Sequence, residues 1–236
     1  MRPVLTIAGR QFRSYFNGPV AYIVICIILL TLGFFFWKTF FLFGRASARE
    51  MFRWLGLILV FSLPALTMGL LAEEKRTGTI ELLITMPVTE AQVIVGKFLG
   101  VLGLYAVLLA LTISYPLSIS TLGDLDWGPV WSGYLGLLLQ GSAVLAIGLM
   151  ASSWTSNQLI ALFVALTLSV FFWVLDKFLA LLPTNAASAL QWLSFDYHFQ
   201  SMARGVIDLR DVLFFVSVVV FALAVAFRAL ESRRWS

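Results

Sequence analysis

The chain has 236 residues, of which 61% are hydrophobic and only 12% are charged, and its formal net charge at pH 7 is +4. Soluble domains carry about a quarter charged residues, so this sequence has too little charge to cover a water-facing surface. One cysteine (Cys26) and one histidine (His198) exclude a disulfide within the chain and a multi-histidine metal site. The basic residues are scattered, which gives no nucleic-acid signature. Together with a mean hydropathy of +0.96, this composition predicts an all-α membrane protein.

The chain begins with a predicted amphipathic helix over residues 2–17. Phe12 falls on its apolar face, and Arg10 and Arg13 fall on its polar face. A basic amphipathic helix of this kind lies flat at the level of the lipid headgroups. The Asn-Gly-Pro tripeptide at 17–19 then turns the chain into the bilayer.

Six apolar segments follow, and they make the whole chain one transmembrane domain. The predicted spans are residues 20–37, 54–71, 96–117, 130–150, 158–175 and 212–227. The uncharged stretch 127–175 is too long for one helix across a core of about 30 Å, so it is divided at the polar residues 152–157. Residues 178–210, interrupted by Pro183, predict a helical hairpin at the outer interface. Basic residues near both ends of the chain favour cytoplasmic N- and C-termini.

The segment between the second and third spans predicts a short helix over residues 79–86. Ile80, Leu83 and Ile84 fall on one face of this helix, and Pro87 ends it. A simple hairpin loop needs only a few polar residues, whereas this segment has an apolar face flanked by charges. It therefore has the features of a docking element.

A capping box is predicted directly after this short helix. The Thr89 hydroxyl and the Gln92 amide have the spacing that satisfies free backbone groups at a helix start. The chain therefore returns to the membrane in a freshly started, rigid helix.

The order of residues in this region carries a family resemblance. The residues that carry it are Glu73, Glu74, Lys75, Arg76, then Gly78, Thr79, Ile80, Glu81, Leu82, Leu83, then Met86, Pro87, Val88, Thr89, and finally Gly96 and Lys97. This order resembles the signature loop of ABC-2-type transporter permeases. The span count, the N-terminal helix and the hairpin before the last span extend the resemblance over essentially the whole chain.

The resemblance implies a non-catalytic permease subunit of an ATP-driven transporter, an exporter in the bacterial inner membrane. In that family the loop forms a coupling helix that docks in a groove of the partner ATPase. Here that role falls on Gly78, Thr79, Ile80, Glu81, Leu82, Leu83, Ile84, Met86 and Pro87. The resemblance also implies two ATPase subunits, which hold ATP and Mg, and a second permease copy, identical or related.

Residues 199–211 resemble the segment before the last span in the gliding-motility-type and copper-enzyme-maturation-type subgroup. That subgroup implies an extracytoplasmic auxiliary protein in the complex.

Several residues within the spans have two interpretations each. Gly96, Gly100 and Gly103 form a small-residue stripe, which serves either helix packing within the subunit or a dimer seam. Gln140 either lines a substrate path or makes an interhelical hydrogen bond. Tyr105 and Tyr115 are further candidates for the path, or they soften the third span near the outer leaflet. His198 is interpreted as an interfacial side chain and not as a ligand.

Two other function classes fit the sequence less well. The chain has no GxxxxGK[ST] motif, so nucleotide hydrolysis of that kind needs another polypeptide. An intramembrane protease of the CAAX type would resemble an EExxxR motif with added histidines, and Glu73-Glu74 lacks the arginine at that position. An ion-coupled carrier usually buries charges within its spans, whereas the charges here fall at span ends. The sequence does not distinguish lipid, peptide, polysaccharide or drug as substrate.

Overall fold

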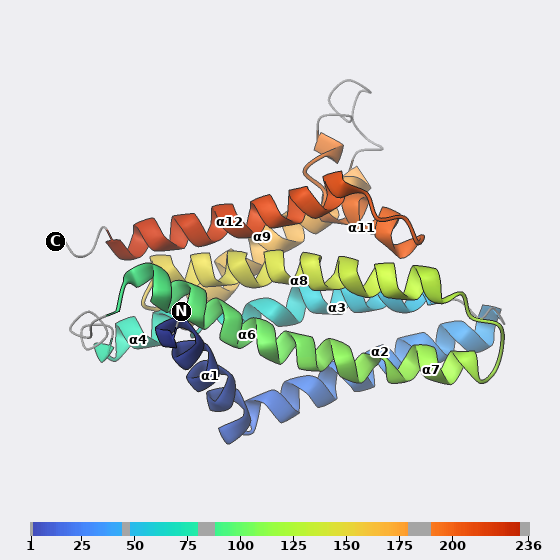
Figure 1. Cartoon of the computed structure of the whole chain (residues 1–236), viewed down its shortest axis with the longest axis horizontal. Helices are drawn as coiled ribbons and strands as arrows, with labels where there is room; N and C mark the ends of the chain where they lie inside the picture. Colours follow the sequence, from blue (N-terminus) through green and yellow to red (C-terminus); the bar gives the residue numbers. More distant parts are fainter. Residues whose placement is uncertain (1, 44–47, 80–87, 179–189, 232–236) are drawn as a thin grey trace.

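The computed structural model describes residues 2–43, 48–79, 88–178 and 190–231, and every regular element in these ranges is a helix. Six of the helices are long. They are α2 (Val20–Phe43), α3 (Arg49–Thr67), α6 (Glu90–Thr112), α8 (Trp127–Trp154), α9 (Gln158–Phe178) and α12 (Leu209–Glu231). Four are shorter: α1 (Arg2–Asn17), α4 (Ala72–Arg76), α7 (Ser114–Ser120) and α11 (Phe195–Ala203). The long helices run side by side along one direction (Figure 1).

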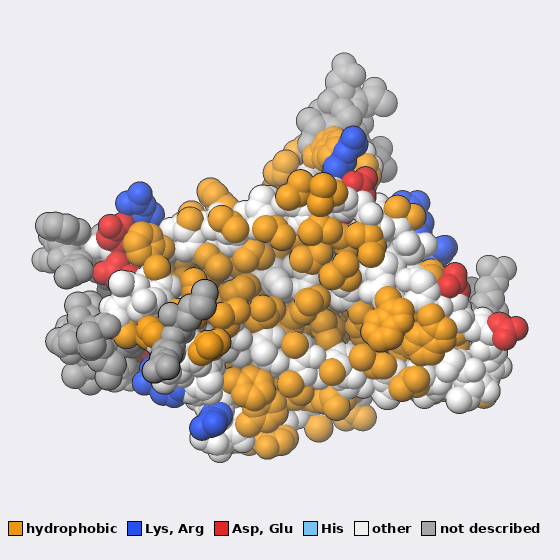
Figure 2. Space-filling model, viewed as in Figure 1, with side chains coloured by type: hydrophobic (Ala, Val, Ile, Leu, Met, Phe, Trp, Pro, Cys, Tyr) orange, Lys and Arg blue, Asp and Glu red, His pale blue; other side chains and the backbone are white. Residues whose placement is uncertain are grey.

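The surface has the layout that a bilayer requires. Apolar side chains cover the middle of the molecule, and charged side chains gather toward its two ends (Figure 2). In the described part of the chain, six helical stretches are long and apolar enough to cross a membrane. The expectation of an all-α membrane protein with six spans is confirmed.

The helices differ in extent from the predicted apolar segments. α6 begins at Glu90, six residues before the predicted third span, and the helix breaks at Ile113 before α7 completes the crossing. α3 begins at Arg49 and ends at Thr67, so that turns occupy residues 68–71. Hydropathy marks the hydrocarbon portion of a helix, whereas its true ends lie where backbone groups find caps.

Helix α8 lies at the centre of the bundle and contacts α3, α6, α9, α11 and α12. Its glycines admit large side chains of its neighbours. A Cβ at Gly136 would lie 3.0 Å from Met202 Cβ, and Cβ atoms at Gly141 and Gly148 would collide with Tyr105 and Thr67. α8 is enclosed by other helices along most of its length, and this is one reason why residues 127–175 carry no charge.

The glycine stripe on α6 lies under α1. Cβ atoms on Gly96 and Gly100 would approach the Cβ atoms of Ile7 and Gln11 to 2.8 Å and 2.6 Å, and one on Gly103 would lie 3.1 Å from the Phe12 ring. Small residues let two helices approach this closely where no hydrophobic driving force holds them. The N-terminal helix therefore rests on the stripe within the same chain.

A hydrogen bond joins α1 to α3 as well. The Tyr15 hydroxyl donates to the Leu66 carbonyl over 2.8 Å. Burial raises the pKa of the Tyr15 phenol, so the hydroxyl keeps its proton and remains a donor.

At the opposite end of the bundle, His198 is buried. Its side chain is 1% exposed; Nδ1 lies 2.7 Å from Asp211 Oδ1, and Nε2 lies 3.0 Å from the Trp192 carbonyl oxygen. The ring also stacks on Phe214 with centroids 4.1 Å apart. The pairing of α11 with α12 places His198 inside the protein at this end of the bundle, against Asp211, and its interpretation as an interfacial side chain stays a prediction.

We expect Gly100→Val to destabilise the protein by about 1–3 kcal/mol, because the new side chain has no space against Gln11 and the Ala8 carbonyl. Gly9→Val is the matched control, since a Cβ at Gly9 on α1 meets nothing within 4 Å. Thermal unfolding in detergent measures both variants. Equal loss of stability in the two would contradict the packing of α1 on the stripe.

Candidate functional site

The candidate site surrounds the predicted coupling segment at the end of the bundle that holds α4. The residues predicted to dock, Ile80, Glu81, Leu82, Leu83, Ile84, Met86 and Pro87, lie outside the described residues. Gly78 and Thr79 are described, and both are exposed. The structure describes the parts of the chain on either side of the segment. Before it lie the turn after α3 and helix α4, and after it lies the start of α6. These parts are called the frame below.

The frame begins where α3 stops and the chain turns into α4. The backbone N–H groups of Leu71 and Ala72 donate to the Ser152 hydroxyl oxygen over 3.0 Å and 2.9 Å, and that hydroxyl donates to the Met68 carbonyl over 3.0 Å. Ser152 is fully buried near the end of α8. A turn buried at this depth must have its free backbone groups satisfied, and one side chain of α8 does this for three of them.

A second link runs from α4 to α8. The Lys75 ammonium group donates to the Ser153 carbonyl oxygen. A short helix of five residues has little stability by itself, so its position here follows from these contacts with the end of α8.

The two flanks of the coupling segment are joined by a buried ion pair. Lys97 Nζ on α6 lies 2.8 Å from Glu74 Oε1 on α4 and donates to the Leu70 carbonyl oxygen over 2.6 Å. The Lys97 side chain is only 2% exposed, and the Glu74 side chain is 23% exposed. The pair thus closes the chain between α4 and α6 at the base of the segment.

The far flank starts with the capping box at Thr89, and this prediction is confirmed. The Gln92 N–H donates to Thr89 Oγ1 over 3.3 Å, and the Thr89 N–H donates to Gln92 Oε1 over 3.2 Å. On the near flank Gly78 has a φ of +73°, a left-handed conformation that glycine adopts without strain. The chain therefore changes direction sharply at Gly78 and restarts a helix at Thr89.

The predicted interfacial residues lie on α1 beside this frame. Arg10 and Arg13 are exposed, whereas Phe12 packs against Gly103. The exposed face around these arginines is hollowed by a shallow depression. The charged side of α1 is thus turned away from the bundle at the same end as the coupling segment.

Two of the three residues considered for a substrate path, Tyr105 and Tyr115, form hydrogen bonds to neighbouring helices. The Tyr105 hydroxyl donates to the Leu137 carbonyl over 2.5 Å, and the Tyr115 hydroxyl donates to the Leu29 carbonyl over 2.7 Å. Gln140 is 3% exposed, and its Oε1 has no hydrogen-bond partner among the described residues.

The sequence predicted no contact for Lys97, which served only as part of the family resemblance, and no role for Ser152. Lys97 was visible as a lysine next to a glycine stripe on an apolar helix, which is an uncommon place for a charge. Its partner was not visible, because Glu74 lies 23 positions earlier, within a run of four charged residues. Ser152 was treated only as part of a polar break between two spans.

We expect Glu74→Gln to destabilise the fold by about 3 kcal/mol, because it leaves the Lys97 charge buried without a counter-ion. Glu73→Gln is the control: Glu73 is exposed on the same short helix, so its change should cost less than about 0.5 kcal/mol. The midpoint of thermal unfolding in detergent compares the two. If both variants unfold together with the unmodified protein, the ion pair contributes nothing to the frame.

Comparison with known proteins bears on the whole bundle. No curated protein sequence matches the chain significantly. Residues 46–227 match the family described as ABC-2 family transporter protein, and that range includes the frame, four of the six spans in full and all but the last four residues of α12. The chain therefore belongs to the ABC-2 family of transporter proteins, as a multi-pass membrane component.

Proposed function

We propose that this chain is the permease subunit of an ATP-driven exporter in the bacterial inner membrane, and that residues 79–86 are its coupling helix. The partner is an ABC ATPase, present in two copies, which holds ATP and Mg. A second copy of the chain, or a related permease, completes the transmembrane part. The N- and C-termini, α1 and α4 all face the cytoplasm.

The observation that carries this proposal is the closed base of the coupling segment. Glu74 before the segment and Lys97 after it form a buried ion pair, and Ser152 holds the preceding turn on α8. A loop tethered at both ends to packed helices transmits a displacement, whereas a loop with free ends absorbs it. Pushing on residues 79–86 therefore acts on α3, α6 and α8 together.

The energetic requirement for coupling is a difference in contacts. ATPase closure changes what the docked segment touches, and this biases the helices between two packings. In this mechanism the frame transmits the displacement of the docked segment to the spanning helices. Nucleotide chemistry is supplied by the partner, since the chain carries no P-loop motif.

The subgroup resemblance of residues 199–211, with its extracytoplasmic auxiliary protein, stays a prediction. In the structure this stretch forms most of α11 and the start of α12, at the end of the bundle remote from α4. An auxiliary protein on the outer side of the membrane would meet this end.

We expect Leu83→Asp to abolish recovery of an ABC ATPase with the purified permease, because a charge on the docking face opposes burial in the ATPase groove. Leu122→Asp is the control, since Leu122 is exposed at the opposite end of the bundle. Both variants are purified in mild detergent, and co-purified ATPase is quantified by mass spectrometry. Retention of the ATPase by Leu83→Asp, with normal ATPase activity, would contradict the assignment of residues 79–86 as the docking segment.

The proposed orientation has its own test. Cys26, the one cysteine of the chain, is replaced by serine, and a new cysteine is introduced by Thr79→Cys or by Leu122→Cys. A membrane-impermeant thiol reagent should label Leu122→Cys in intact cells, and Thr79→Cys only in inverted membrane vesicles. The reverse pattern would place the coupling segment outside the cell and refute the proposal.

A further inference from the structure

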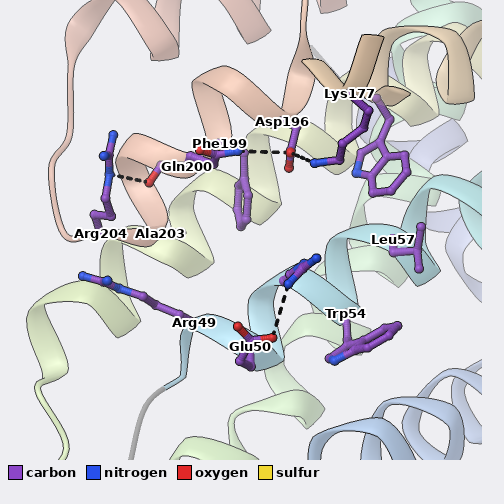
Figure 3. A pocket seen from close by; sticks show the side chains of 12 residues that line it. Arg49, Glu50, Trp54, Leu57, Lys177, Asp196, Phe199, Gln200, Ala203 and Arg204 are labelled. Atoms are coloured by element: carbon purple, nitrogen blue, oxygen red, sulfur yellow. Dashed lines mark hydrogen bonds and ion pairs between the residues drawn. The ribbon is translucent and has the colours of Figure 1, made fainter. Parts of the chain in front are cut away.

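A cavity of about 580 Å³ lies at the end of the bundle opposite the coupling segment. The first turns of α3, the last turn of α9 and helix α11 enclose it (Figure 3). None of its lining residues belongs to the frame around the coupling segment. It is therefore a separate feature of the fold.

The polar side of the cavity carries an excess of positive charge. Its lining includes four cations, Arg49, Arg53, Lys177 and Arg204, and two carboxylates, Glu50 and Asp196. This imbalance favours an anion over a neutral or cationic molecule.

The two carboxylates do not neutralise all of these cations equally. Asp196 Oδ2 lies 2.6 Å from Lys177 Nζ and accepts a hydrogen bond from Gln200 over 3.1 Å, so this carboxylate is paired with Lys177. Glu50 lies 3.8 Å from Arg53, with side chains 45% and 73% exposed, and such a contact contributes little. Arg53 therefore retains most of its capacity to bind an external anion.

Arg204 is the second cation with donors to offer. Its Nε donates to the Gln200 carbonyl over 3.2 Å, and its exposed guanidinium group extends along α11, away from Arg49 and Glu50 (Figure 3). Arg204 therefore adds to the positive charge of the lining, and a planar guanidinium group can bind two oxygens of a tetrahedral oxyanion.

The other side of the cavity is apolar and aromatic. Trp54, Leu57, Trp173 and Phe199 line it. The Trp54 indole N–H is buried and has no hydrogen-bond partner among the described residues. Tryptophans are typical of the boundary between headgroups and hydrocarbon, and α3 and α9 are both long and apolar enough to cross the membrane. A ligand held here thus meets cations at one end and hydrocarbon-compatible surface at the other.

We infer that this cavity binds the headgroup of an anionic phospholipid, with its phosphate at the positively charged part of the lining and the start of its acyl chains along Trp54 and Leu57. A free phosphate ion would use the arginines but not the apolar wall. A zwitterionic lipid would use the wall, but its own cation would oppose the excess positive charge. The bilayer around the six spans supplies this ligand at high local concentration.

The test measures lipid retention by native mass spectrometry. The protein is purified in a neutral detergent and incubated with equal amounts of phosphatidylglycerol and phosphatidylcholine. We expect preferential retention of phosphatidylglycerol. In the double variant Arg53→Gln/Arg204→Gln this preference should fall about fivefold for each cation removed. Both side chains are exposed, so the variant should fold, and its thermal unfolding without added lipid verifies this.

The control variant Lys38→Gln/Arg210→Gln removes the same charge from exposed residues at the same end of the bundle, outside the cavity lining. It should retain phosphatidylglycerol as the unmodified protein does. Equal retention of phosphatidylcholine, or an equal loss in both double variants, would overturn the assignment. Displacement of the lipid by inorganic phosphate during incubation would show a free-oxyanion site, and would also overturn it.

Discussion

In a bilayer, a polar backbone group that faces hydrocarbon has no water to bind, so every break in a spanning helix must be satisfied from within the protein. The break between α3 and α4 shows how the chain meets this constraint. Ser152 on α8 accepts two backbone N–H groups and donates to a carbonyl, and the Lys97 ammonium group takes up the Leu70 carbonyl. The position of α4, and with it the start of the coupling segment, depends on these few bonds.

The same constraint makes Glu74 and Lys97 interdependent. A lysine with a side chain only 2% exposed is tolerated because a carboxylate lies 2.8 Å away, and the pair fixes α4 relative to α6. His198 and Asp211 form a comparable pair at the other end, between α11 and α12. Each pair joins the two helices on either side of a connection, so each end of the bundle holds one such polar contact.

Packing in the middle relies on close approach more than on apolar burial, because lipid tails are as apolar as leucine side chains. The glycines of α6 receive α1, and those of α8 receive Tyr105 and Thr67 from neighbouring helices. α9 and α12 keep most of their apolar surface on the outside. The chain thus combines a tightly packed centre around α8 with outer helices that present broad apolar faces.

Much of this architecture can be predicted from short segments of the sequence. Hydropathy gives the six spans, because a helix that crosses hydrocarbon must be apolar over about 20 residues. The capping box at Thr89 is equally local, since its two hydrogen bonds join residues three positions apart. The glycine stripe predicted that another helix packs closely on α6, but it did not indicate that this helix is α1.

What only the tertiary structure decided are the partners of isolated polar residues. Lys97 pairs with Glu74, Ser152 binds the turn after α3, and His198 contacts Asp211. Each contact depends on helix packing, which no short-range sequence pattern encodes. The cavity with Arg53 and Arg204 has the same origin, because its walls come from helices far apart in the chain. The sequence alone determined which segments enter the membrane, since that is a property of each segment. It did not determine which side chains meet there, since a meeting is a property of two segments and of the packing that brings them together.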